Sequence, residues 1–238
     1  MKNSFEITHN TIISCKIKQP VRIVQISDLH DCLYGSSQSE LTDAAVSLQP
    51  DFIVCTGDLF NRKKPSCKDN AICLIRNLLK IFPVFIVEGN HEARLGAEGA
   101  CYLNDLEASG AIVLRNEAVD YDDIHIIGLV QRPCKTDLSG LISEKRFNLV
   151  LSHRPELFSM YSSCGSDLVL SGHAHGGQIR IGEYSLIAPE QGLFPKYTSG
   201  MYSSGFSRMY VSRGLGDTVV IPRINNPHEL ALISLIPD

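Results

Sequence analysis

Five short motifs along the chain carry carboxylate, amide and imidazole side chains, and none of the five contains cysteine. Hard oxygen ligands mixed with imidazole suit a first-row divalent ion, or two such ions that share a carboxylate. A bridged pair of ions activates water at neutral pH and holds a phosphate group, so hydrolysis of a phosphoester is the first hypothesis. In chain order the motifs are Ser27-Asp28-Leu29-His30, Thr56-Gly57-Asp58, Glu88-Gly89-Asn90-His91-Glu92, Ser152-His153-Arg154 and Ser171-Gly172-His173-Ala174-His175-Gly176-Gly177.

The spacing within the first and last motifs favours shared ligands. Asp28 and His30 stand two residues apart, as do His173 and His175. In an extended segment, side chains at this spacing point to the same side of the backbone, so each pair can ligate one ion. The glycines around the last pair allow a tight backbone around the two imidazoles. Two histidines between glycines serve no packing purpose, which makes this motif the most specific of the five.

The middle motifs complete the set of ligands. Asp58 follows Gly57 at the predicted end of a strand, where its carboxylate could bridge two cations. Asn90 offers a neutral amide oxygen, and His153 offers another imidazole. Together with the two pairs above they make seven ligands, which are too many for a single tetrahedral zinc. The set therefore predicts two divalent metal ions, for which Mn, Fe and Zn are all suitable.

The first half of the chain alternates apolar, β-branched runs with helical patterns, and each apolar run ends at a motif. Strands that alternate with helices of this length predict a parallel sheet with right-handed crossovers. Ligands of such a sheet gather at the carboxyl ends of its strands. Ser39 is the expected N-cap of the first helix. The predicted strands cover residues 21–27, 52–56 and 84–87, and the predicted helices cover residues 39–48 and 69–80.

The second half predicts shorter strands, a helix over residues 102–109, and long ordered loops between residues 172 and 227, where glycine and proline are frequent. A mixed second sheet packed on the first would account for these strands. No linker-like stretch divides the chain, so residues 1–238 are expected to form one domain. The strands are predicted at residues 124–128, 149–152, 168–171, 209–212 and 230–235.

Composition narrows the class of protein. The 238 residues are 44% hydrophobic and 20% charged with a net charge of −4, which is ordinary for a globular protein and lacks the basic excess of a nucleic-acid-binding protein. No apolar run approaches the roughly 18 residues of a transmembrane segment, and the first residues lack a secretory signal. Eight cysteines without C-x-x-C spacing favour reduced thiols. We expect a cytoplasmic protein that acts on a small molecule; a nuclease stays an alternative, since bound metals could supply positive charge.

The motif series resembles the calcineurin-like metallophosphoesterase family, whose pattern is D-x-H, G-D, G-N-H, H and G-H-x-H. The segment from Gly172 to Gln178, with the later run from Tyr210 to Gly216, is similar to the bacterial branch that carries G-H-x-H-G-G-Q. The resemblance covers nearly the whole chain. It implies an α/β fold of two packed mixed β-sheets flanked by helices, a four-layer α-β-β-α sandwich.

The resemblance also implies a division of roles. His91 would protonate the departing oxygen or stabilise the charge of the transition state, while a metal-bound hydroxide attacks phosphorus in line. Asp58 would bridge the two metals. The first metal would be held by Asp28, His30 and His175, and the second by Asn90, His153 and His173.

The resemblance leaves the substrate open. We expect hydrolysis of phosphodiester or pyrophosphate bonds in a small molecule. A UDP-sugar-lipid pyrophosphatase is a specific rival, because the similar bacterial branch includes hydrolases of nucleotide-linked lipid precursors. A phosphomonoesterase or protein phosphatase is a further alternative. The protein phosphatase is disfavoured because Leu59, Phe60 and Asn61 follow Asp58, where the protein phosphatases continue with D-R-G. A catalytically silent scaffold would have lost ligands and above all His91, all of which are present.

Polar and aromatic residues outside these assignments have structural or open roles. Asp31 is expected as a solvated loop carboxylate, Cys32 as a residue that does not bind metal, and His125 as a structural histidine in a strand. Four residues are candidates for contact with substrate, and four aromatic residues could line a cleft or pack the C-terminal loops. They are Arg154, Gln178, Arg213 and Arg223, and Tyr184, Phe194, Tyr197 and Tyr202.

Overall fold

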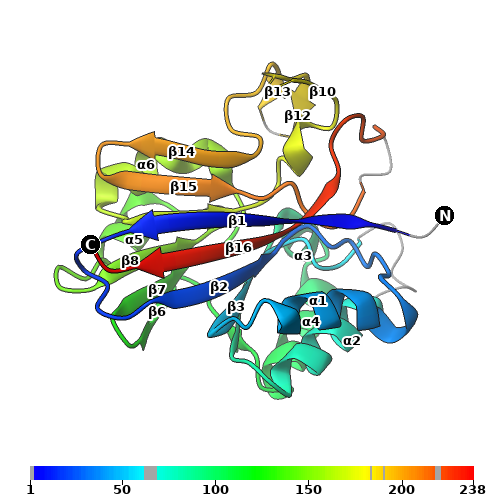
Figure 1. The fold of residues 1–238 in the computed structure, drawn as a ribbon, viewed down its shortest axis with the longest axis horizontal. Helices are drawn as coiled ribbons and strands as arrows, with labels where there is room; N and C mark the ends of the chain where they lie inside the picture. Colours follow the sequence, from blue (N-terminus) through cyan, green and yellow to red (C-terminus); the bar gives the residue numbers. More distant parts are fainter. Residues whose placement is uncertain (1–2, 62–68, 183, 190, 218–220) are drawn as a thin grey trace.

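Two six-stranded sheets lie face to face, and helices cover their outer sides (Figure 1). The computed structural model describes residues 3–61, 69–182, 184–189, 191–217 and 221–238. This arrangement is the mixed α/β architecture that the sequence predicts, with helices on the two outer faces.

The first sheet has a parallel centre. Its central strands β2, β3 and β4 are apolar and mostly buried on both faces, as expected where helices pack on one side and a second sheet on the other. Strand β16 is antiparallel to β2 and parallel to β1. The order across the sheet is β1 (Phe5–Ile13), β16 (His228–Ile236), β2 (Val21–Ile26), β3 (Phe52–Thr56), β4 (Val84–Val87) and β5 (Ile112–Val113).

The second sheet also has a parallel centre, formed by β15, β9, β8 and β7. The two edge strands are antiparallel to their neighbours and reach them through short hairpins. The order is β14 (Gly200–Ser204), β15 (Ser207–Val211), β9 (Leu168–Ser171), β8 (Phe147–Leu151), β7 (Ile124–Gly128) and β6 (Glu117–Tyr121).

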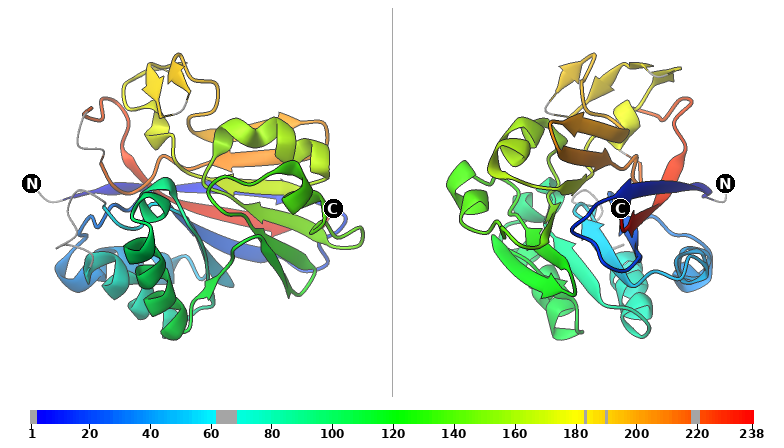
Figure 2. Two further views of the ribbon diagram at one scale, coloured as in Figure 1. Left: turned by 180° about the vertical axis from the view of Figure 1, so that it is seen from behind. Right: turned by 60° about the vertical axis from the view of Figure 1, so that its left-hand side comes forward.

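Helices form the outer layers, as the two views in Figure 2 show. The outer face of the first sheet is covered by α1 (Ser39–Ser47), α2 (Asp69–Leu79) and α4 (Ala97–Ala108). The outer face of the second sheet is covered by α5 (Lys135–Ser139) and α6 (Phe158–Cys164). No helix among the described residues is long and apolar enough to cross a membrane.

Short elements complete the chain. Two small hairpins pair β10 (Arg180–Ile181) with β11 (Tyr184–Ser185) and β12 (Ile187–Ala188) with β13 (Gly192–Leu193), and they project beyond the second sheet (Figure 1). Where the sequence predicts long ordered loops, the chain therefore forms these hairpins. The remaining elements are α3 (Asn90–Arg94) and the 3-10 turns η1 (Ser36–Gln38), η3 (Pro155–Leu157) and η4 (His175–Gly177).

Most predicted elements agree with the structure within two residues at their shared ends, but α4 begins earlier than expected, at Ala97. All four edge strands of the two sheets, β1, β5, β6 and β14, escaped sequence reasoning, and β5 has only two residues. Strands β1, β6 and β14 have exposed, polar positions along their length, so their apolar pattern is weak. The expected N-cap is also wrong. Gln38, with φ of 64°, precedes the first residue of α1, and no side chain caps the helix, because the chain enters α1 directly from η1.

A hydrophobic core fills the space between the two sheets. Phe52 and Phe85 extend from the first sheet with ring centroids 5.3 Å apart, and Phe147 and Leu149 extend from the second sheet into the same cluster. All four are almost fully buried. Because loops from both sheets build the site described below, this core determines the geometry of that site.

We expect Phe52→Ala to lower the free energy of unfolding by about 3–5 kcal/mol, since it leaves a cavity between the sheets. Urea denaturation measures this change. Ile81→Ala is the control, because Ile81 is 55% exposed and its truncation should change stability by no more than about 0.5 kcal/mol. Equal effects of the two substitutions would contradict the role given to this core.

Candidate metal centre

The predicted metal ligands lie on five loops at one edge of the two sheets. The loops follow the carboxyl ends of β2, β3 and β4 in the first sheet and of β8 and β9 in the second. Parallel strands end at the same edge of a sheet, so facing sheets bring these loops together. The structure places all eight predicted residues here, namely Asp28, His30, Asp58, Asn90, His91, His153, His173 and His175.

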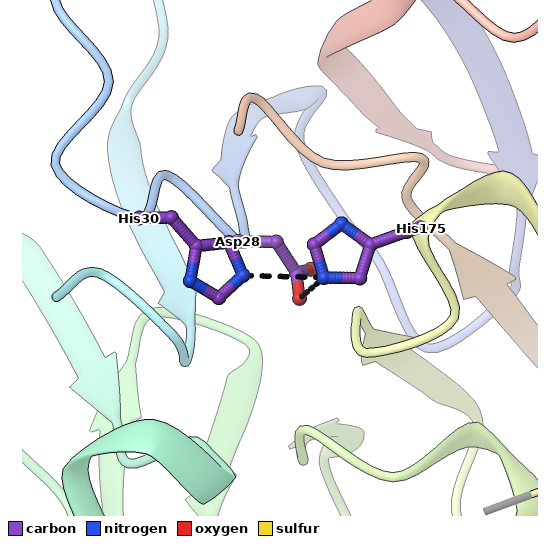
Figure 3. Close-up of side chains that lie close together, drawn as sticks. All are labelled: Asp28, His30 and His175. Atoms are coloured by element: carbon purple, nitrogen blue, oxygen red, sulfur yellow. Dashed lines mark hydrogen bonds and ion pairs between the residues drawn. The ribbon is translucent and has the colours of Figure 1, made fainter. Parts of the chain in front are cut away.

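One cluster consists of Asp28, His30 and His175 (Figure 3). His30 Nε2 lies 3.2 Å from His175 Nε2, and His175 Nε2 lies 3.4 Å from the Asp28 carboxylate. Three lone-pair donors therefore converge on one small volume, an arrangement that suits a divalent cation.

A second cluster consists of Asp58, His153 and His173, with Asn90 beside it. His173 Nδ1 lies 3.1 Å from His153 Nε2, and the same His153 nitrogen lies 3.3 Å from Asn90 Oδ1. His153 Nδ1 lies 2.8 Å from the Thr56 carbonyl, to which it can donate, so Nε2 is the nitrogen that faces the other donors.

Asp58 belongs to the second cluster and also forms a third donor group with His30 of the first cluster and with His91. One carboxylate oxygen, Oδ2, is 3.4 Å from His153 Nε2, 3.8 Å from His30 Nε2 and 4.0 Å from His91 Nε2. Asp58 is 2% exposed. This one side chain thus faces donors from both clusters and from the first turn of α3.

Burial shapes the protonation of the histidines. Burial lowers the pKa of His30 to about 4, against the opposing charge of Asp58. Burial, together with neighbouring positive groups, holds the pKa of His173 and His175 well below the usual range. These imidazoles are neutral at pH 7, so their lone pairs are available to a cation.

The pKa values of the carboxylates Asp58 and Asp28 shift in opposite directions. Burial would raise the pKa of Asp58, but His153 and the other nearby imidazoles hold it well below its usual range. His153 shows the matching effect: burial opposes its charge, yet the Asp58 carboxylate raises its pKa. Burial and the nearby Asp58 raise the pKa of Asp28 to about 6. Buried carboxylates and neutral imidazoles packed this closely suit divalent cations. Bound cations would supply the positive charge that the cluster otherwise obtains from protons.

The backbone of the clusters is not extended. Asp28, His30, His173 and His175 all have positive φ, between 47° and 70°, and Asp58 has φ of 52°. The expectation that each i, i+2 pair lies on one side of an extended segment is therefore wrong. Asp28 and His30 converge on one cluster because left-handed residues turn the loop sharply, whereas His173 and His175 belong to different clusters. Left-handed backbone costs energy in residues other than glycine and is concentrated at functional sites.

Glu92 is a residue of this site whose role sequence reasoning missed. Its carboxylate accepts hydrogen bonds from the backbone N–H groups of Asp58 at 2.9 Å, Gly89 at 2.8 Å and Phe60 at 3.0 Å. Burial, then the nearby Asp58, raises the pKa of Glu92 to about 7. The signal was present, because a glutamate three residues after Gly89 has the spacing of a capping box at the start of a helix.

Two close approaches explain the glycines of the motifs. A Cβ on Gly89 would fall 2.2 Å from Asp58 Oδ1, and a Cβ on Gly172 would fall 1.9 Å from Ser27 Oγ. Ser27 Oγ donates a 2.6 Å hydrogen bond to Asp28 Oδ2. Only glycine leaves room for the carboxylates at these positions.

Other residues from the sequence analysis divide into several groups. The expectation for Asp31 is wrong: it is 6% exposed and accepts a 2.7 Å hydrogen bond from the Asn61 backbone, because the loop after β3 covers it. The structural role of His125 is confirmed, since its two nitrogens lie 2.6 Å from Asp120 and 2.9 Å from the Leu141 carbonyl. Cys32 lies outside the donor clusters found among the described residues.

The arginines predicted to contact substrate lie in different surroundings. Arg213 bonds to the carboxylates of Glu6 and Glu229. Arg223 lies behind His175, with Nη2 3.3 Å from His175 Nδ1. Arg154, by contrast, lines a pocket that includes Asn90.

The remaining candidates are either buried or lie at a second hollow. Gln178 is 3% exposed, and its backbone carbonyl accepts from the Asn226 amide. Tyr184, Phe194 and Tyr202 line a second hollow of about 540 Å³, whereas Tyr197 packs against Phe158 and Tyr202.

Comparison with known proteins agrees with this geometry. The family model for calcineurin-like phosphoesterases matches residues 21–177. The metallophosphoesterase YkuE of Bacillus subtilis is 31% identical over 247 residues, covering 97% of this chain and 85% of the relative. The phosphodiesterase YaeI of Escherichia coli is 28% identical over 233 residues, covering 91% of this chain and 83% of the relative. The fold is similar to that of the protein TT1561 from Thermus thermophilus, with a TM-score of 0.58, 13% identity, and coverage of 82% of this chain and 90% of that one.

Carboxylate and imidazole donors clustered at the common edge of two facing sheets, together with these matches, identify a metal-dependent hydrolase of phosphoric esters. The chain belongs to the calcineurin-like phosphoesterase family.

We expect Gly89→Ala to weaken the binding of divalent metal by about 10–100-fold, because the new methyl group displaces Asp58. Titration with Mn²⁺ in competition with a chelating dye measures the change. Gly140→Ala is the matched control, since φ of Gly140 is −74° and the nearest atom to its new Cβ is 3.5 Å away. Metal affinity that is unchanged in Gly89→Ala would show that Asp58 does not contribute to binding.

Proposed function

We propose that the protein is a dinuclear metal-dependent phosphoesterase that hydrolyses phosphodiester or pyrophosphate bonds of a small molecule. The observation that carries the proposal is the position of the Asp58 carboxylate, within 4.0 Å of imidazoles from both clusters. A carboxylate in that position can bridge two cations. The segment from Gly172 to Gln178 supports membership of the bacterial branch that carries G-H-x-H-G-G-Q.

The ligands divide between two sites. Two divalent ions, when bound, supply Lewis acidity toward the phosphate and lower the pKa of water. Asp58 would serve both sites. Asp28, His30 and His175 would hold one ion, and Asn90, His153 and His173 would hold the other.

His91 forms a third donor group with His30 and Asp58, but we assign it to the substrate rather than to a metal. Its side chain is 20% exposed, in contrast to the almost fully buried ligand imidazoles of His30 and His153. Its backbone N–H donates a 2.7 Å hydrogen bond to Asp58 Oδ1, which holds the start of α3 against the bridge. From this position the imidazole can protonate the departing oxygen or stabilise charge on it.

The general activity can be tested with two chromogenic esters. After chelation, Mn²⁺, Zn²⁺, Fe²⁺ and Mg²⁺ are added back separately, and hydrolysis of bis-p-nitrophenyl phosphate is compared with that of p-nitrophenyl phosphate. We expect a transition metal to restore hydrolysis of the diester in preference to the monoester. Preference for the monoester would overturn the diester assignment, and no turnover in protein shown to hold two ions would count against a general phosphoesterase.

His91→Ala should reduce the turnover of bis-p-nitrophenyl phosphate by about 100-fold or more, because a positioned acid is lost. The metal content, measured by inductively coupled plasma mass spectrometry, should stay that of the wild type. His9→Ala is the control, since His9 is an exposed histidine on β1. Loss of metal from His91→Ala would instead make His91 a ligand.

A further inference from the structure

A pocket of about 380 Å³ opens next to the second donor cluster. It shares Asn90 with that cluster. A substrate group bound in the pocket would therefore lie beside a substrate group bound at the metals. The pocket is built where the loops after β4, β7 and β8 meet. Its described lining residues are Glu88, Asn90, Ala93, Arg94, Val130, Gln131, Arg132 and Arg154.

The pocket is positively charged in a chain whose net charge is −4. Its lining includes the guanidinium groups of Arg94, Arg132 and Arg154 and the carboxylate of Glu88. That carboxylate accepts a 3.0 Å hydrogen bond from the backbone N–H of Gln131, so it holds the loop after β7 against the end of β4. Cations gathered at the edge of a metal cluster repel one another, and an anion bound between them relieves this repulsion.

One of the three arginines is held rigidly. Arg154 is 7% exposed, its Nε donates to the Gln131 carbonyl at 2.9 Å, and its Nη1 lies 2.7 Å from Glu156. Arg94 and Arg132 are exposed and reach the pocket from α3 and from the loop after β7.

We infer that the pocket formed by Arg94, Arg132 and Arg154 binds a second phosphate of the substrate, joined to the phosphate that lies at Asn90. Arginine pairs with phosphate through two parallel hydrogen bonds, and a volume of about 380 Å³ is within the range of small-ligand sites. A simple diester has one phosphate, which lies at the metals, and so brings no second anionic group to the pocket. This inference rests on the proposed function and narrows its substrate class to pyrophosphate-linked diesters.

The position of the pocket also gives the arginines a part in the reaction. The oxygen of water forms a bond to the phosphorus at the metals, and the bond from that phosphorus to the bridging oxygen breaks. The electron pair departs with the second phosphate, to which the remaining proton of water is transferred. The products are two phosphate monoesters. The arginines offset the negative charge that develops on the departing phosphate.

The test compares ADP-ribose, a pyrophosphate diester, with bis-p-nitrophenyl phosphate on the Mn²⁺-loaded full chain. Arg94→Ala and Arg132→Ala should each raise KM for ADP-ribose by about tenfold. The rise in KM for bis-p-nitrophenyl phosphate should be several-fold smaller. Arg132→Lys should recover part of the loss, because it keeps the charge. Arg76→Ala is the control: Arg76 is an exposed arginine on α2 that bonds to Ser109, and its removal should change neither KM. Equal rises for both substrates, or no rise for ADP-ribose, would overturn the inference.

A binding measurement separates this inference from the proposed function. Isothermal titration with α,β-methylene-ADP, whose P–C–P link resists hydrolysis, needs no turnover. If the wild type hydrolyses neither substrate, the proposed function fails. The arginine pocket then stands if Arg94→Ala and Arg132→Ala weaken binding of this probe by about tenfold, and it is overturned if they bind it as the wild type does.

Discussion

The carboxylate of Asp58 is the group around which the site is arranged. A buried anion is costly unless positive charge or hydrogen bonds compensate it. Asp58 receives both, because one oxygen accepts from the His91 backbone and the other faces imidazoles of His30 and His153. The same placement is the reason for proposing this carboxylate as the bridge of a dinuclear site. Metal ions and protons therefore compete for one constellation of donors.

The donor side chains are held in place by strained backbone and by many supporting hydrogen bonds. The loop after β2 pairs with the loop after β3 through hydrogen bonds from Asp28 to Gly57 and from His30 to Asp58. Glu92 joins the β3 loop to the first turn of α3 through three backbone N–H groups. Several of these contacts fix residues with positive φ, namely Asp28, His30 and Asp58. Packed strands can in this way maintain left-handed residues at a site.

The two-sheet architecture also explains why the site is asymmetric. The first sheet contributes Asp28, His30, Asp58 and Asn90, and the second contributes His153, His173 and His175. The arginine pocket lies where the loops after β4, β7 and β8 meet, on the side of Asn90. The arginines that would bind a charged substrate group thus lie beside one donor cluster. The core between the sheets keeps the two donor clusters aligned.

The sequence by itself determined the central strands, the two-sheet class of the fold and the set of residues at the candidate site. This was possible because the relevant signals are local: apolar β-branched runs mark strands, and acidic, amide and imidazole groups follow them directly. The support of the site was decided by tertiary structure. Glu92 bonds to Asp58, 34 residues away, and Arg94, Arg132 and Arg154 meet only because three loops converge. Strand β1 likewise depends on β16 at the other end of the chain. Contacts between distant segments leave no periodic pattern in a single sequence, since they arise only when the sheets pack.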